Sequence, residues 1–99
     1  MAMMEDASFD PAVLISQPIP KYPPVLREIG LSGRVVFQFI VDTTGRVESS
    51  STRVIESTND GFEAPARESV AAAVFHPACL GPHLVRQRTE QPVRFIATR

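Results

Sequence analysis

The most regular hydrophobic pattern in the chain lies between Gly33 and Asp42. Large apolar side chains occupy every second position there, namely Val35, Phe37, Phe39 and Val41. Polar or charged residues such as Arg34 and Gln38 fall on the other face. A period of two is typical of a β-strand that buries one face. We therefore predict a strand here with its apolar residues turned inward.

A hairpin turn is predicted directly after this strand. Residues Asp42 to Gly45 supply polar turn chemistry, and Gly45 is the natural residue for a positive φ. We expect an antiparallel partner strand from Arg46 to about residue 56. Three serines, Ser49–Ser51, interrupt its apolar alternation, and this interruption predicts a β-bulge.

Two helices are predicted, one short and one long. Pro23–Pro24 suits a first helical turn and Gly30 suits a left-handed C-cap, so the short helix lies between them. The long helix begins at Asn59 or Asp60, either of which can act as an N-cap, and ends before Pro77. Its apolar face is formed by positions at helical spacing, which are Phe62, Ala66, Val70 and either Ala73 or Val74.

A second strong strand pattern lies near the C-terminus. Val93 and Phe95 point to one face of a strand predicted over residues 84–96. Pro92 lacks an amide hydrogen, so this strand should lie at a sheet edge or be broken in two. Near the start of the chain, the apolar run 12–15 precedes two prolines and predicts at most a brief edge strand.

Size and charge exclude several classes of function. With 99 residues the chain supports one domain, which we place at residues 11–99; residues 1–10 are expected to be a disordered or added N-terminus. The formal net charge of −1 gives no strong field for nucleic acid or anionic lipid. The single cysteine excludes an intramolecular disulfide. No export signal or long apolar run is present, so a membrane anchor is expected only in a longer parent protein.

No pattern in the chain predicts a metal site. His76, Cys79 and His83 carry ligand-forming side chains, but Pro77 and the Gly81–Pro82 pair break any helix that would align them. We expect His76 to end the long helix. Cys79 is expected to pack as a small apolar residue.

Catalytic and phosphate-binding patterns are also missing. The serine-rich strand has no Gly-x-Ser-x-Gly elbow, and the five glycines form no phosphate loop. Residues 33–37 faintly resemble the phosphate loop of acylphosphatase, but that family's Gln-Gly step is absent. We predict no catalytic residue, no cofactor and no metal.

Five segments in a fixed order resemble the TonB C-terminal domain family. They are residues 17–24 with their Pro-Lys-Tyr-Pro-Pro core, 33–41, 42–47, 75–78 and 92–95. Their order and spacing carry the resemblance, which spans the chain from about Ile15 to Phe95. It implies an α+β fold in which a three-stranded antiparallel sheet is packed on one face by two helices.

The resemblance also implies a function. Proteins of this family are energy transducers anchored in the inner membrane, where proton-channel partners couple them to the proton-motive force. They reach across the periplasm to open outer-membrane TonB-dependent transporters for siderophores, vitamin B12 and similar cargo. The expected location is therefore the periplasm, with a tether to the inner membrane that this chain does not contain. No nucleic-acid partner is implied.

In the better-known members of the family, the TonB box of the transporter adds as a strand beside the domain's last strand, here Thr89–Ala97. An edge strand offers unpaired backbone N–H and C=O groups to such a guest. The predicted partner-binding residues are Gln17, Pro18, Tyr22, Pro23, Arg88, Gln91, Val93, Arg94, Phe95 and Ile96. Arg88, Gln91 and Arg94 are expected to face outward and set selectivity. Val93 and Phe95 are expected to stay in the core.

Several alternatives stay open. The last strand could pair with a second copy of the chain, which would give a homodimer. The domain could be a structural or oligomerising element, like TolA, or the sensor ectodomain of a larger membrane protein, without transporter binding. Tyr22 could stack on a ligand or wedge against the end of a helix.

Overall fold

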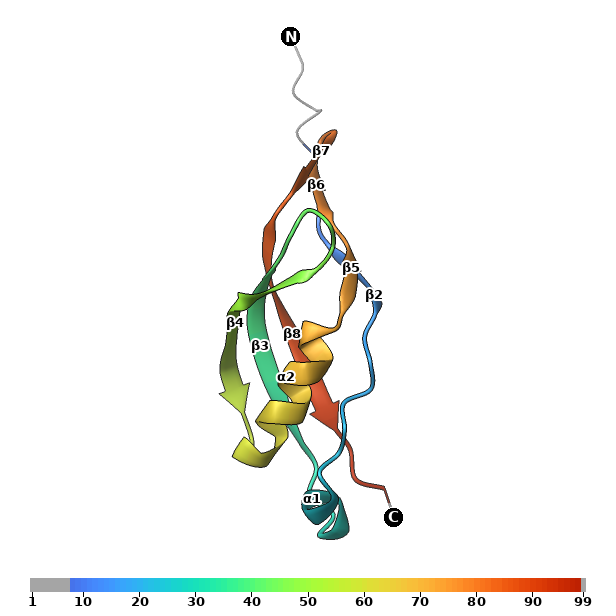
Figure 1. Ribbon diagram of the computed structural model, residues 1–99, viewed down its shortest axis with the longest axis vertical. Helices are drawn as coiled ribbons and strands as arrows, with labels where there is room; N and C mark the ends of the chain where they lie inside the picture. The colour runs from blue at the N-terminus through green and yellow to red at the C-terminus, as the bar shows by residue number, and fades with distance from the viewer. Residues whose placement is uncertain (1–7, 99) are drawn as a thin grey trace.

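The computed structural model describes residues 8–98 and shows an α+β domain built around one antiparallel sheet (Figure 1). Strand β3 (Gly33–Val41) lies at its centre, with β4 (Val47–Ser57) on one side and β8 (Gln87–Phe95) on the other. Both neighbours run antiparallel to β3. The three-stranded sheet expected from the sequence is therefore present, and β8 lies at one of its edges.

One face of this sheet packs against the helix and forms one side of the hydrophobic core. The alternating apolar residues of β3 are each at most 1% exposed, namely Val35, Phe37, Phe39 and Val41. A 3-10 turn (Asp60–Phe62) and helix α2 (Glu63–Ala71) lie across this face (Figure 1). They bury Phe62, Ala66 and Val70 in the same cluster. The periods of the sequence thus predicted the inward faces of strand and helix.

Only one helix covers the sheet, which corrects the expectation of two. Helix α1 (Pro24–Glu28) has five residues, none of them buried, and lies at one end of the molecule (Figure 1). A helix this short has no apolar face to lay on a sheet, and only its Leu26 packs against the core. The long helix also ends earlier than predicted, at Ala71. His76 therefore lies in a strand and does not end a helix.

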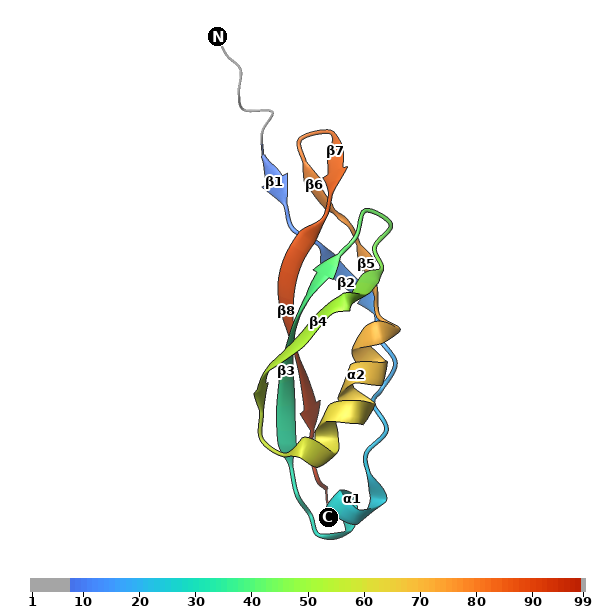
Figure 2. The same ribbon diagram turned by 60° about the vertical axis from the view of Figure 1, so that its left-hand side comes forward.

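Two small sheets accompany the main one and were not predicted. Strand β2 (Val13–Ser16) pairs with β5 (Val74–His76), and β1 (Phe9–Asp10) joins β6 (Ala78–Leu80) and β7 (His83–Val85). Figure 2 shows them continuing the main sheet toward one end of the domain. The molecule is consequently elongated, with extents of 62, 23 and 21 Å.

The N-terminal strand was predicted, but its position was not. Strand β2 covers most of the range 12–15 expected for it, yet it pairs with β5 and not with the main sheet. Phe9 and Asp10 were expected to precede the domain, whereas they pair with Leu80 and Cys79. The rest of the predicted N-terminal segment, residues 1–7, lies outside the described residues.

The strand predicted over residues 84–96 is broken, at Arg86 and not at Pro92. Arg86 separates β7 from β8, and its guanidinium donates two hydrogen bonds of 2.7 and 2.8 Å to the carboxylate of Glu48. These bonds lower the pKa of Glu48 and raise the pKa of Arg86. Pro92 lies within β8. An edge strand tolerates it because the missing amide can belong to the unpaired side.

The predicted bulge in β4 is confirmed. The register between β3 and β4 shifts after Val36 and again after Gln38. At the second shift, the hydroxyl of Ser51 accepts the N–H of Ile40 at 2.9 Å and donates to the carbonyl of Glu48 at 2.6 Å. A serine side chain thus replaces a backbone partner where the ladder is interrupted.

The hairpin turn between β3 and β4 is held by one carboxylate. Asp42 Oδ1 accepts hydrogen bonds from the hydroxyl and N–H of Thr44 and from the N–H of Arg46, at 2.6, 2.8 and 3.0 Å. These donors, the Thr44 hydroxyl first, hold the pKa of Asp42 below its ordinary value. Gly45 has φ +87°, and its carbonyl accepts the N–H of Phe75 at 2.8 Å. The turn is therefore tied directly to β5.

Candidate functional site: the free edge of β8

Strand β8 has one strand neighbour in the described chain. It pairs with β3 along its whole length in an uninterrupted register from Gln87↔Val41 to Phe95↔Gly33. No described strand lies on its other side. Its second edge is therefore unpaired, as the sequence-based prediction required.

The hydrogen bonds of Arg34 identify which backbone groups of β8 point to this free edge. The N–H and C=O of Arg34 both form hydrogen bonds with Thr58, which directly follows β4. Successive residues of a strand direct these groups to alternate sides, so those of Val35 face β8. Val93, opposite Val35, then faces β3. Arg94 and the other even-numbered residues of β8 face away from it.

The outward backbone groups belong to four residues, namely Arg88, Glu90, Pro92 and Arg94. Because a proline has no N–H, three of them can donate and all four can accept. The side chains of the same four residues are exposed. A guest strand added here would thus meet a row of backbone groups interrupted once, at Pro92.

The inward residues of β8 include one that was predicted to face outward. Val93 and Phe95 are 3% and 2% exposed, so their prediction as core residues is confirmed. Gln91 lies on the same face, directly opposite the buried Phe37, and is partly buried. Its predicted outward orientation is wrong, because the period of two in a strand places Gln91 on the same face as Val93 and Phe95. Ile96 is 69% exposed and follows the strand.

The segment that holds Gln17 and Pro18 lies against the inner side of β8. The Gln17 amide accepts a hydrogen bond from the Gln91 side chain at 3.2 Å and donates one to Ser69 on α2 at 2.9 Å. The Ser69 hydroxyl donates in turn to the carbonyl of Pro18 at 2.5 Å. This segment is therefore fastened between the helix and the core side of the edge strand.

Tyr22 has a structural role, the second of the two considered for it. Its ring packs edge-on against Phe62 and Phe95, with centroid distances of 5.8 and 5.6 Å. Its hydroxyl donates to the carbonyl of Leu31. Pro23 precedes α1 and lines a shallow surface pocket of about 290 Å³ beside the start of α2. These two residues anchor the chain at the end of the core.

The N-terminal segment does not occupy the free edge. Its contacts with β8 run through side chains, as in the bond from the Ala12 N–H to Gln87 Oε1 at 2.7 Å. In the part of the chain that the structure describes, no backbone hydrogen bond joins this segment to β8. The backbone groups on this edge of β8 therefore have no backbone partner among residues 8–98.

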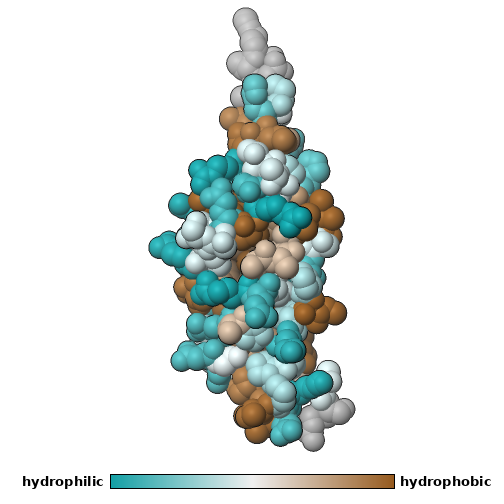
Figure 3. All heavy atoms as spheres, in the orientation of Figure 1, coloured by the Kyte–Doolittle hydropathy of each residue, from teal (hydrophilic) through white to brown (hydrophobic). Residues whose placement is uncertain are grey.

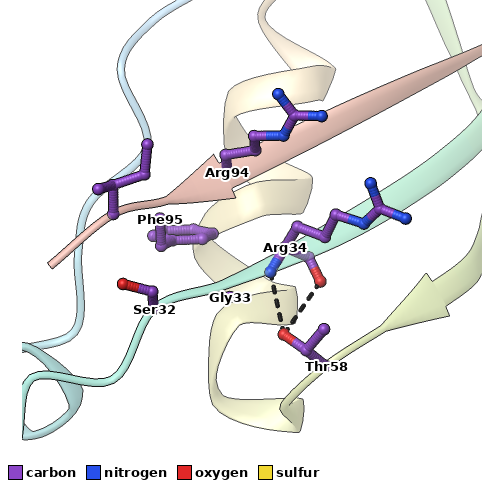
Figure 4. A pocket seen from close by; sticks show the side chains of 7 residues that line it. Ser32, Gly33, Arg34, Thr58, Arg94 and Phe95 are labelled. Atoms are coloured by element: carbon purple, nitrogen blue, oxygen red, sulfur yellow. Dashed lines mark hydrogen bonds between the residues drawn. The ribbon is translucent and has the colours of Figure 1, made fainter.

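A shallow hollow lies where β3 begins and β8 ends (Figure 4). It has a volume of about 310 Å³ and is lined by Ser32, Gly33, Arg34, Thr58, Arg94, Phe95 and Ile96. Arg34 and Arg94 are cross-strand partners in the register. The sequence pattern predicted that Arg34 lies on the outer face of its strand, but it did not predict that Arg94 lies opposite. No local signal fixes how β3 pairs with a strand about 50 residues away.

Large apolar side chains are exposed at several places on the molecule. Leu80 and Leu84 lie on β6 and β7, and Val25 and Ile29 lie on and after α1. Figure 3 shows apolar atoms near both ends of the long axis and in smaller patches between them, among hydrophilic atoms.

The residues considered for metal binding are separated onto three short strands. His76, Cys79 and His83 lie on β5, β6 and β7. Within residues 8–98 no three ligand-forming side chains gather into a group that could hold a metal ion. Neither described helix is long and apolar enough to cross a membrane.

Comparisons with known proteins agree with this geometry. A solution NMR structure of the TonB C-terminal domain of Pseudomonas aeruginosa has the same fold, with a TM-score of 0.72 over 89% of this chain and 88% of that one, at 24% sequence identity. No curated protein sequence matches the chain. The family model of the Gram-negative bacterial TonB protein C-terminal matches residues 18–97. The chain therefore belongs to the TonB C-terminal family.

Proposed function

We propose that the free edge of β8 binds the TonB box of outer-membrane transporters as an added strand. Family membership implies energy transduction to TonB-dependent transporters and makes the chain a non-enzymatic domain. The finer proposal is that this chain couples the proton-motive force of the inner membrane to the uptake of siderophores or vitamin B12-like cargo. It would act in the periplasm, tethered by an anchor outside this chain.

One observation carries the proposal, namely the unpaired edge of β8. Unsatisfied backbone groups of an edge strand are a template for an extended peptide. The outward N–H groups of Arg88, Glu90 and Arg94, with the neighbouring carbonyls, supply the hydrogen bonds. Gln17, Pro18, Tyr22 and Gln91 support the strand from within, and Pro23 anchors the supporting segment.

The first experiment is an NMR titration of the domain with synthetic TonB-box peptides. We expect amide shifts along Thr89 to Ala97, together with slower hydrogen exchange at Glu90 and Arg94. The amides of Thr89, Gln91 and Val93 should already be slow in the free domain because they face β3. Shifts limited to β4, or no response to any peptide, would contradict the proposal.

A matched pair of variants separates the backbone from the side chain. Glu90→Pro removes the outward N–H of Glu90 but no bond to β3, and we expect it to weaken peptide binding by roughly two- to tenfold, the value of one hydrogen bond. Glu90→Ala removes only the side chain and should bind within about twofold of the wild type. Equal affinities for the two variants would exclude strand addition at this position.

Sedimentation with and without the same peptides tests the second candidate function, which is self-association through β8. The free edge favours a second copy for the same physical reason that it favours a peptide. Sedimentation of the domain without peptide would reveal a dimer. If the dimer persists equally in the presence of a TonB-box peptide and of a peptide of scrambled sequence, the structural or oligomerising function is favoured.

A further inference from the structure

Two arginines occupy opposite positions on neighbouring strands at the end of the candidate site. Arg34 on β3 and Arg94 on β8 are directly opposite in the register. Because the backbone groups of Arg34 face β4, this is a non-hydrogen-bonded pair, in which opposite side chains approach most closely. Like charges in this arrangement destabilise a sheet. The pair therefore needs an explanation beyond folding.

Only one of the two charges is compensated within residues 8–98. Arg34 Nη2 lies 2.9 Å from Glu56 Oε2, on the side of β4. The structure pairs no described carboxylate with Arg94. The outer face of β8 thus ends in a cation whose nearest cross-strand neighbour is another cation.

The arginine side chain is also directed toward the proposed guest. In Figure 4 the guanidinium of Arg94 extends on the side of β8 away from β3, whereas Arg34 lies over β3. Repulsion from Arg34 favours this orientation. The guanidinium of Arg94 therefore lies next to the position that a strand added to β8 would occupy. Arg94 also lines the hollow that contains Ser32 and Thr58.

We propose that the partner segment carries an Asp or Glu carboxylate facing Arg94. The inference rests on the proposed strand addition at β8. A guest residue opposite Arg94 places its side chain on the same outer face of the sheet. A carboxylate there completes an alternation of charges in which Glu56 balances Arg34 and the guest balances Arg94.

The chemistry favours a carboxylate over other side chains. A guanidinium presents a planar set of donors that matches two carboxylate oxygens. A basic guest residue at this position would add a third cation to Arg34 and Arg94. The expected gain is modest, because an exposed cross-strand ion pair changes affinity by about two- to fivefold, and it should shrink as salt is raised.

The test is a double-mutant cycle with the synthetic TonB-box peptides as probes. Each Asp and Glu of a peptide is replaced in turn by Asn or Gln, and affinities for the wild-type domain and for Arg94→Gln are measured at low and high salt. We expect one of these replacements to weaken binding to the wild type by about two- to fivefold and to have no effect on Arg94→Gln. The side-chain Nε–H signal of Arg94 should move only with the acidic peptide.

Arg53→Gln is the matched control, because Arg53 lies on β4 and donates to Gln38 at 2.9 Å, away from the edge. This variant should keep the full effect of the carboxylate. If every neutralised peptide shifts the β8 amides and binds as tightly as its parent, strand addition stands and the carboxylate inference is overturned. If the carboxylate effect survives in Arg94→Gln, its assignment to Arg94 is wrong. If no peptide shifts β8 at all, both proposals fail.

Discussion

Phe37 illustrates how much of the core one residue can control. It lies in the middle of the central strand, is completely buried, and has the guanidinium of Arg67 5.5 Å from its ring centroid. Its register partners are Val54 on β4 and Gln91 on β8, and Arg67 belongs to α2, so Phe37 connects the sheet to the helix. Truncating it leaves a cavity that these layers cannot close without moving together.

We expect Phe37→Ala to reduce the free energy of unfolding by about 3 to 5 kcal/mol. Chemical denaturation of the purified domain measures this change. Ile19→Ala is the matched control, because Ile19 is 93% exposed and its truncation should change stability by less than about 0.5 kcal/mol. A loss below about 1 kcal/mol for Phe37→Ala would mean that its contacts are not those described.

At the scale of elements, the sequence predicted best where a long period or a local turn decides the structure. The period of two in β3, the turn at Asp42–Gly45 and the N-cap expected at Asn59 or Asp60 all identified their elements, and the structure places the N-cap at Asn59. Strands β5 and β6 were missed because three residues are too short to show a period, and β7 was predicted only as part of one longer strand with β8. Two of them pair with strands from the far end of the chain, β5 with β2 and β6 with β1, while β6 and β7 also pair with each other.

The hairpin turn should make the domain sensitive to acid. The pKa of Asp42 is lowered by its hydrogen bonds to Thr44 and Arg46. A carboxylate with a lowered pKa in the folded state stabilises that state above its ordinary value, 3.8, and the contribution is lost as the pH falls through the lowered value. The same sign applies to Glu48, whose pKa is lowered by Arg86.

We therefore expect the wild type to lose stability below about pH 4, and Asp42→Asn to lose less over the same range. Unfolding curves recorded from neutral to strongly acid pH measure both slopes. Glu48→Gln, alone and combined with Asp42→Asn, separates the two carboxylates. Identical slopes for Asp42→Asn and the wild type would show that the turn does not contribute to the acid response.

For the whole molecule, the pairing of β8 with β3 is the feature that the sequence could not supply. It sets which residues of the two strands lie opposite each other, and so it places Arg94 opposite Arg34 and Gln91 opposite Phe37. It also directs Pro92 to the free edge, where a proline hinders edge-to-edge pairing between copies. Under the proposed strand addition, we expect Pro92 to limit association between copies.

Pro92→Thr should restore the missing outward N–H and increase self-association. Sedimentation over a series of protein concentrations measures the change, and we expect the variant to form dimers at lower concentration than the wild type. Pro65→Thr, on α2 and away from the edge, is the control and should sediment as the wild type does. Unchanged sedimentation of Pro92→Thr would show that Pro92 does not protect the edge.

The elongated shape has a mechanical consequence for a guest on β8. The strands of the main sheet run roughly along the long axis, and the segment that begins at Ser8 lies at the end opposite α1 (Figure 2). A guest strand would lie along the same direction. When tension is applied at opposite ends of this axis, the hydrogen bonds between the guest and β8 are loaded in shear and must break together. A pull perpendicular to the strands would break them one at a time.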